Sequence, residues 1–245
     1  MRALVAGNWK MNGLASGLAE LSSLKDALAL RPAACDVLVC PPATLIAPAA
    51  AKVQGAFSLG GQDCHIRPSG PYTGDVSAEM LKDAGASFVI VGHSERRQHH
   101  GERDCDVAAK AQAAWRAGLT AIICIGESEA QRYAGDANQI CAGQLDRSVP
   151  GGATTANTAI AYEPVWAIGT GKTPTFAEIA AMHGHIRSCL VRRLGEAGRG
   201  LRILYGGSVK PDNASEILNL PEVSGALVGG ASLKASDFLG IIAGA

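Results

Sequence analysis

The chain has 245 residues, 47% of them hydrophobic, and its 22 basic residues balance its 22 acidic ones. This apolar content is sufficient for a sizeable buried core, whereas a net charge of zero offers no basic surface for nucleic acid or an anionic membrane. The chain also lacks an apolar segment of membrane-spanning length and the N-terminal pattern of a signal peptide, so we expect a cytoplasmic protein that contacts neither membrane nor nucleic acid.

Short apolar segments recur along the chain, and most are continuous rather than alternating with polar residues. Strands that are buried on both faces of a parallel sheet show this pattern. In chain order, the predicted strands are residues 4–6, 37–40, 57–59, 88–91, 121–125, 159–162, 201–205 and 226–228.

Segments rich in alanine, leucine and charged residues lie between these strands and favour helices. The predicted helices are residues 16–30, 77–84, 104–117, 129–147, 176–194 and 211–218. Asp104 and Thr175 are expected to cap the N-termini of two of these helices, and Gly118 and Gly195 to end the same two.

The repetition of strand and helix predicts the fold class. Eight strand–helix units without a linker indicate an α/β protein, a single (β/α)8 barrel with a closed parallel sheet of eight strands, over residues 1–245. An open doubly wound sheet is the alternative, but the nucleotide-binding Gly-x-Gly-x-x-Gly pattern does not follow the first strand. In a barrel the chemistry is located at the carboxyl ends of the strands, so the residues after each strand are the candidates.

Polar side chains follow the first and fourth predicted strands. Asn8 and Lys10 emerge two residues apart, so in an extended segment both point the same way, although a lysine here can also simply be solvated. His93 follows the fourth strand beside a short helix whose amide groups disfavour a charged ring, so we expect a neutral, hydrogen-bonding imidazole. Glu95 is expected to pair with Lys10 or with Arg96.

The sixth predicted strand ends at a carboxylate. Glu163 precedes Pro164, which cannot continue a sheet and keeps the preceding residue extended. On its own, an acid before a proline more often belongs to an ordinary surface loop. The residues behind it combine apolar side chains with glycines, as expected of a loop that covers a site, so Glu163 is a candidate general base beneath a lid. The predicted lid comprises Pro164, Val165, Trp166, Ala167, Ile168, Gly169, Thr170, Gly171, Lys172 and Thr173.

Paired glycines follow the last two predicted strands. Gly206 and Gly207 end the seventh, and Gly229 and Gly230 end the eighth. Each pair alone often marks only a tight turn. Two pairs at the ends of the last two strands expose backbone amides that can hold a phosphate, in the part of a barrel where phosphate commonly binds.

Together these candidates predict a reaction. Glu163 can remove a carbon-bound proton next to a carbonyl, while His93 and Lys10 stabilise the oxygen of the resulting enediolate. The seven cysteines are scattered without zinc-ligand spacing, and no nucleotide-binding motif is present. We therefore expect an isomerisation that uses neither a metal nor a cofactor.

Five segments are similar, in sequence and in order, to those of the triosephosphate isomerase family, and the resemblance extends over essentially the whole chain. They read GNWKMN at 7–12, VGHSERR at 91–97, AYEPVWAIGTGKT at 161–173, YGGSV at 205–209 and GALVGGASL at 225–233. The resemblance implies a TIM barrel that interconverts dihydroxyacetone phosphate and D-glyceraldehyde 3-phosphate, in glycolysis and gluconeogenesis.

The resemblance also implies a role for each candidate. Glu163 is the base that carries the proton between adjacent carbons, and His93 is the neutral electrophile. Asn8 and Lys10 position and polarise the triose phosphate substrate. The family's phosphate-binding positions correspond to Gly169, Ser208, Gly229 and Gly230.

Two further expectations come from the resemblance. Residues 62–75 are similar to the family's dimer-forming loop, which implies a homodimer in which Thr73 supports Lys10 of the partner subunit. Pro174 follows the lid, where family members commonly have alanine, and it is expected to stiffen the hinge.

Two other functions remain open at this stage. A related enzyme that isomerises a longer, four-carbon phosphorylated ketose could keep every catalytic residue. A phosphate-binding scaffold with a vestigial site is the other possibility, but binding alone does not require Glu163, His93 and Lys10 together.

Overall fold

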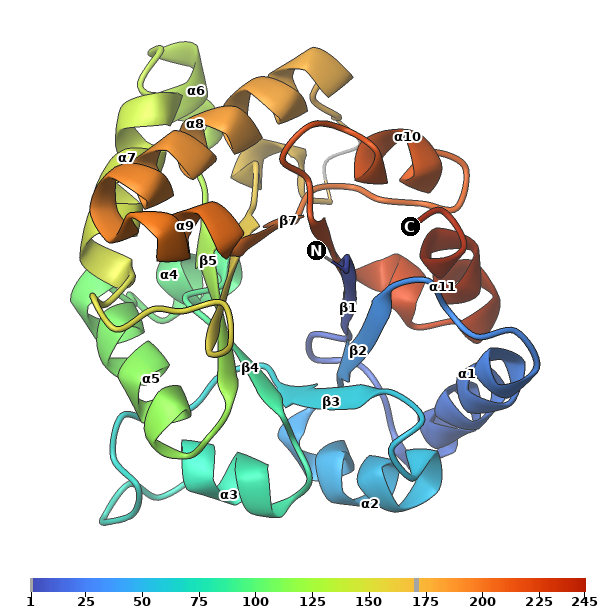
Figure 1. The fold of residues 1–245 in the computed structure, drawn as a ribbon. Helices are drawn as coiled ribbons and strands as arrows, with labels where there is room; N and C mark the ends of the chain where they lie inside the picture. Colours follow the sequence, from blue (N-terminus) through green and yellow to red (C-terminus); the bar gives the residue numbers. More distant parts are fainter. Residues whose placement is uncertain (1, 170–171) are drawn as a thin grey trace.

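The computed structural model describes residues 2–169 and 172–245, and it contains a closed barrel of parallel strands (Figure 1). The strands lie in sequence order around the barrel, and β1 pairs with β8 to close it. They are β1 (Leu4–Asn8), β2 (Asp36–Cys40), β3 (Ser58–Gly61), β4 (Phe88–Val91), β5 (Thr120–Ile125), β6 (Thr158–Tyr162), β7 (Arg202–Tyr205) and β8 (Gly225–Val228). The predicted fold class is confirmed, and so are all eight strands.

Helices surround the barrel, as Figure 1 shows. The α-helices are α1 (Leu18–Leu30), α2 (Ala43–Val53), α3 (Ala78–Asp83), α4 (Ser94–His99), α5 (Asp104–Arg116), α6 (Glu129–Tyr133), α7 (Ala137–Ser148), α8 (Phe176–Leu194), α9 (Glu196–Gly200), α10 (Ala214–Leu218) and α11 (Ala235–Ile242). The described residues also form short 3-10 helices, η1 (Ala15–Gly17), η2 (Val165–Ala167) and η3 (Gly230–Ser232). Among the described residues, no helix has the length and apolarity needed to cross a membrane.

The strands are buried on both faces, which explains their continuous apolar sequences. In β1, the side chains of Leu4 and Ala6 belong to a cluster inside the barrel, whereas Val5 packs into the layer between the sheet and the helices. The inner cluster also takes Leu38 from β2 and Ile122 from β5. Because both layers are apolar, a strand shows no alternation with polar residues.

The helix predictions differ from the structure in several places. The single helix predicted at 129–147 is two, α6 and α7, because the chain turns at Gly135, whose φ is +82°. α2, α9 and α11 were not among the predicted helices; α2 contains Pro48, and a proline in the interior normally interrupts a helix. The helix predicted at 211–218 begins only at Ala214, after a turn.

The predicted helix ends are mostly correct. Thr175 caps α8 by accepting a hydrogen bond from the amide of Glu178, whose carboxylate accepts one from the amide of Thr175 in return. Gly195 ends α8, and Gly118, with a φ of +72°, follows α5. The prediction that Asp104 caps α5 is wrong by one residue, because Arg103 holds the capping position and Asp104 is the first helical residue.

Candidate active site

A cavity of about 330 Å³ lies at the carboxyl ends of the strands. The loops after β1, β4, β6, β7 and β8 all contribute to its wall. Its lining includes eight residues that the sequence nominated for catalysis or for phosphate binding: Asn8, Lys10, His93, Glu163, Gly169, Ser208, Gly229 and Gly230. The fold therefore brings together residues that are more than 200 positions apart in the chain.

Lys10 reaches the cavity from a strained backbone. Its φ is +54°, a left-handed conformation that a residue with a side chain rarely adopts. The conformation is held by hydrogen bonds: the amide of Lys10 donates to Asn8 Oδ1 at 3.0 Å, and Gln62 Nε2 donates to the carbonyl oxygen of Lys10 at 2.8 Å. The ammonium pairs with Glu95 Oε1 at 2.5 Å, so the first of the two expected pairings of Glu95 is the one formed. Strain held by surrounding contacts is typical of functional sites.

His93 is buried at the start of α4 and faces Glu163. Its Nδ1 accepts a hydrogen bond from the amide of Glu95 at 3.2 Å, which is the arrangement of a neutral ring, and its Nε2 lies 2.9 Å from Glu163 Oε1. Burial opposes charging of the ring, but the Glu163 carboxylate outweighs it and raises the pKa of His93. The sequence predicted a neutral ring from the helix amides alone. The contact between His93 and Glu163 is a tertiary one, and no local pattern reveals it.

Glu163 is 2% exposed and its carboxylate is bound on several sides. The amide of Ser94 donates to Oε2 at 3.0 Å, and the Ser94 hydroxyl donates to Oε1 at 3.3 Å. Burial alone would raise the pKa of Glu163, but His93 and the Ser94 amide outweigh it and lower the pKa. The site thus holds an ionised carboxylate that is itself shielded from water, as a general base requires.

The first part of the predicted lid rests on a buried acid that the sequence analysis missed. Glu127 is fully buried, and its Oε1 accepts hydrogen bonds from Trp166 Nε1 at 2.8 Å and from the Tyr162 hydroxyl at 3.1 Å. The Arg132 guanidinium lies 5.2 Å from the centre of the Trp166 ring. Nothing in the local sequence distinguishes Glu127 from a surface acid.

The second part of the lid leads to α8. Lys172 forms an ion pair with Glu129 on α6, and Pro174, just before the capping residue Thr175, is buried. The predicted lid residues Thr170 and Gly171 lie outside the described residues.

The far side of the cavity is formed by glycine-rich turns. A Cβ atom at Gly206 would lie 2.9 Å from Glu163 Cγ and 3.0 Å from the Tyr162 carbonyl oxygen, so only glycine fits there. The loop after β8 is tied to the loop after β1, because Trp9 Nε1 donates to the Ser232 carbonyl at 3.0 Å. Backbone amides at such turns suit an anion.

Lys210 is a second residue that the sequence analysis missed. It lines the cavity two positions after Ser208 and is exposed. Within residues 2–169 and 172–245, its ammonium has no hydrogen-bond or ion-pair partner. A positive charge two residues after a Gly-Gly-Ser turn was the signal that could have identified it.

Thr73 is not part of this cavity. It lies exposed in the loop at 62–75, which projects from the barrel between β3 and α3 (Figure 1). The loop is ordered by its own contacts: the rings of His65 and Tyr72 lie 4.1 Å apart, and His65 Nε2 lies 3.7 Å from Asp75 Oδ2.

Comparisons with known proteins agree on one family. The sequence model of the triosephosphate isomerase family matches residues 3–245. The chain is 60% identical to a triosephosphate isomerase of Rhodopseudomonas palustris (strain BisA53), covering 100% of this chain and 98% of the relative, and 61% identical to one of Jannaschia sp. (strain CCS1), covering 99% and 97%. The crystal structure of triosephosphate isomerase from Bartonella henselae is 49% identical over 98% of both chains, with a TM-score of 0.92.

Proposed function

We propose roles for these residues from one premise: the chain belongs to the triosephosphate isomerase family. It interconverts dihydroxyacetone phosphate and D-glyceraldehyde 3-phosphate, an aldose–ketose isomerisation of glycolysis. The observation that carries the residue assignment is the ionised Glu163 carboxylate, which faces His93 Nε2 at 2.9 Å in a cavity that Lys10 also lines.

Glu163 is the base in this proposal. It takes a proton from one carbon of the triose and returns it to the neighbouring carbon, with an enediolate between the two steps. The 2.9 Å contact between Glu163 and His93 leaves no room for a substrate, so the bound triose replaces that hydrogen bond on both sides. Glu163 then faces the carbon-bound hydrogen, and His93 Nε2 faces the oxygens.

Two side chains, His93 and Lys10, stabilise the oxygens, and two others hold Lys10 in place. His93 donates from Nε2 because its Nδ1 is already occupied as an acceptor. The Lys10 ammonium stabilises the developing negative charge, and Asn8 orients Lys10 through its hydrogen bond to the Lys10 amide. Glu95 holds the ammonium in place by the ion pair at 2.5 Å.

The lid protects the intermediate. An enediolate next to a phosphate ester can expel the phosphate, and an open, wet site permits that loss. Closure of residues 164–173 over the substrate excludes water and strengthens the charge interactions inside. Because the phosphate is remote from the reacting carbons, its binding to Gly169, Ser208, Gly229 and Gly230 can drive that closure.

Lys210 is expected to add charge to the phosphate site. Among the described lining residues other than His93, only Lys10, Glu163 and Lys210 carry a formal charge, and Lys10 is already paired with Glu95. The Lys210→Gln variant should therefore lower kcat/KM about tenfold, mainly through a higher KM, as expected for one partly screened charge interaction. Steady-state assays at two ionic strengths measure this, since the loss should shrink at high salt.

A matched control for Lys210 is Lys52→Gln, at the last turn of α2 and outside the cavity lining. It should leave kcat/KM unchanged. If Lys210→Gln behaves like this control at low salt, Lys210 does not contact the phosphate.

The chain is proposed to form a homodimer. Met11 is 97% exposed and Leu14 is 78% exposed beside the catalytic Lys10, and the loop at 62–75 projects from the same molecule. Large apolar side chains that are left in water suit a self-complementary interface, and a protruding loop can reach across it, with Thr73 of the partner subunit near Lys10.

Sedimentation velocity tests the dimer. The unmodified chain should sediment at twice the mass of one chain, and Met11→Glu should shift it towards monomers with a lower kcat, because a buried charge destabilises the interface. A fully active monomer of the unmodified chain would refute the proposal.

We propose that residues 1–245 form one domain located in the cytoplasm.

A coupled assay on the purified protein tests the proposed function as a whole, including the proposal that the triose is preferred over longer sugars. The values of kcat/KM for the two trioses should be much higher than the value for a four-carbon ketose phosphate. No isomerase activity, or a preference for the longer sugar, would reject the assignment.

A further inference from the structure

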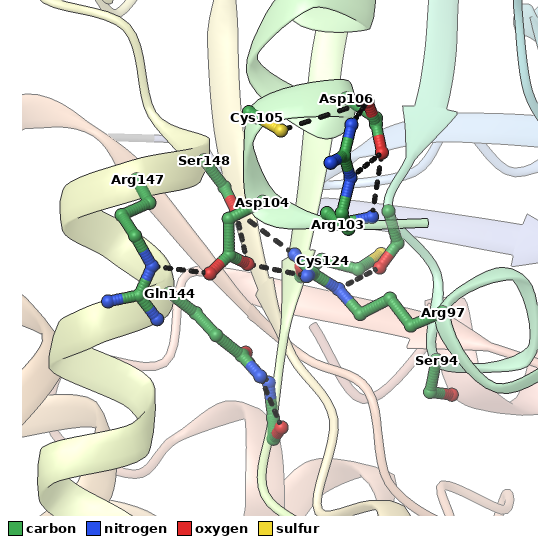
Figure 2. A network of polar contacts seen from close by, with 12 residues as sticks. Ser94, Arg97, Arg103, Asp104, Cys105, Asp106, Cys124, Gln144, Arg147 and Ser148 are labelled. Atoms are coloured by element: carbon green, nitrogen blue, oxygen red, sulfur yellow. Dashed lines mark hydrogen bonds and ion pairs between the residues drawn. The ribbon is translucent and has the colours of Figure 1, made fainter. Parts of the chain in front are cut away.

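A mostly buried guanidinium borders the same small cavity as Ser94 and Glu163, and the reaction as described does not use it. Arg97 is one turn after His93 in α4, and its side chain is only 16% exposed. Figure 2 shows it at the centre of a polar network, with Ser94 to one side and Asp104 to the other.

The Arg97 side chain binds backbone oxygens of two neighbouring strands. Its Nε donates to the Gly92 carbonyl at 2.8 Å, at the end of β4, and one Nη donates to the Cys124 carbonyl at 3.1 Å, in β5. Gly92 directly precedes His93 and has a φ of +68°. A Cβ atom at Gly92 would lie 2.6 Å from Val107, so the turn is fixed in position as well as in conformation.

The second of these strands, β5, supports the catalytic base Glu163. β5 pairs with β6, and the amide of Glu163 donates to the Ile125 carbonyl at 2.8 Å, one residue after Cys124. Arg97 therefore spans the two strand ends that carry His93 and Ser94 on one side and support Glu163 on the other. The relative position of these ends sets the distances from Glu163 to Ser94 and to His93.

The positive charge of Arg97 is balanced by Asp104, on the side of the guanidinium facing α5. Asp104 Oδ1 lies 2.6 Å from an Nη of Arg97, and the fully buried Ser148 hydroxyl accepts from Arg97 at 3.1 Å and donates to Asp104 at 3.0 Å. Burial would raise the pKa of Asp104, but Arg97 and Arg147 outweigh it and keep the pKa low. Asp104 begins α5 and Ser148 ends α7, so the guanidinium is held against two helices and two strands.

We propose that Arg97 is a positioning residue for the catalytic base. It fixes the β4–α4 turn against β5, and thereby places the Ser94 donors and His93 Nε2 at hydrogen-bond distance from Glu163. This inference rests on the proposed role of Glu163. It predicts an effect on kcat rather than on KM, because Lys10 belongs to the loop on β1, and Ser208, Gly229 and Gly230 belong to the loops on β7 and β8.

If Arg97 only stabilised the fold, its loss would have different effects. Loss of a purely structural residue lowers the melting temperature and the folded fraction, but each folded molecule keeps its kcat and its pH profile. Loss of a positioning residue changes both in the folded molecules. A shift of about 1 Å between reacting groups can cost about 100-fold in rate.

The kinetic test uses two variants of Arg97 in the full chain, and a third, Arg97→Ala, is used for chemical rescue. Arg97→Met removes the charge and every hydrogen bond, and should lower kcat per folded molecule about 100-fold with KM within threefold. Arg97→Lys keeps the charge next to Asp104, but one ammonium cannot span both carbonyls, so kcat should fall about tenfold at nearly unchanged stability. Circular dichroism and thermal melts give the folded fraction for each variant.

The pH dependence of kcat/KM distinguishes the two roles, because losing a purely structural residue would not change it. The Ser94 amide lowers the pKa of Glu163, so a displaced turn raises that pKa, and the acid limb of kcat/KM should shift to higher pH in both variants. A second readout is chemical rescue of Arg97→Ala by guanidinium ion, since Arg97, Ser94 and Glu163 line a common cavity of about 130 Å³. Sodium chloride at equal ionic strength is the control for rescue.

Arg147→Met is the matched control variant. Arg147 binds the outer oxygen of Asp104 at 2.8 Å but touches neither strand end, and its side chain is 65% exposed. It should keep kcat within twofold and the pH profile unchanged. Glu163→Gln is run in parallel, so that retained activity in that variant identifies a failure of the base assignment itself.

The outcomes separate the two possibilities. A lower kcat with a shifted acid limb in Arg97→Lys, and a normal Arg147→Met, support the positioning role. Wild-type kcat and pH profile in folded Arg97→Lys overturn it, whether or not Arg97→Met folds.

Discussion

Replacing Glu163 with aspartate should lower kcat about 100-fold while KM stays within a few-fold. Aspartate keeps the charge but withdraws the carboxylate by roughly 1.5 Å, one carbon–carbon bond. The Ser94 donors, at 3.0 and 3.3 Å, hold the native carboxylate where a glutamate reaches, so the shorter side chain cannot meet both these donors and the substrate carbon. Binding of the phosphate is remote from this change, which keeps KM nearly constant.

Steady-state kinetics with both trioses measures the effect. The Glu163→Gln variant removes the base altogether and should lose about 10,000-fold, the upper range for general base catalysis. Glu196→Asp is a suitable control because this glutamate is 86% exposed on α9. Full activity in Glu163→Asp would mean that another group removes the proton.

Replacing His93 with glutamine should lower kcat by about 100- to 1,000-fold, the typical loss when one donor to a developing oxyanion is removed. Glutamine retains an N–H donor but lacks the rigid ring, whose Nδ1 is fixed by the Glu95 amide. The pH dependence should change as well. His93 lowers the pKa of Glu163, so without it that pKa rises, and activity should be lost at a higher pH as the solution is acidified.

The exposed His99 at the end of α4 provides the comparison for His93. His99→Gln should leave both kcat and the acid limb unchanged. A His93→Gln enzyme with a normal acid limb would show that the contact with Glu163 does not control the ionisation of the base.

The sequence was sufficient for the barrel because its signals are local. Most strands contain a continuous apolar segment, as β6 does, and Thr175 with Glu178 marks the start of α8 by residue type and spacing alone. The errors arose where tertiary packing overrides local preference. Pro48 is tolerated inside α2, and β3 continues through Gly60 and Gly61, which an apolar pattern cannot register.

The residues of the site also divide into those that local sequence signals reveal and those that only tertiary contacts reveal. Residues directly after strands, such as Lys10, His93 and Glu163, were accessible to reasoning because a barrel places all strand ends at one mouth. Glu127 and Arg97 were not, because their importance arises from contacts with residues distant in the chain and from burial that no local pattern encodes.

The closure of the barrel by β1 and β8 has a consequence for the newly made chain. Leu4 pairs with Gly225 and Gly7 with Val228, so the first strand stays without one partner until residues 225–228 have left the ribosome. Lys10 and Gly229, on opposite sides of that seam, meet only then. A nascent or truncated chain thus exposes an unpaired strand edge and is open to aggregation or chaperone capture. It also cannot assemble the pocket, so no incomplete enzyme generates a reactive enediolate that it fails to protect.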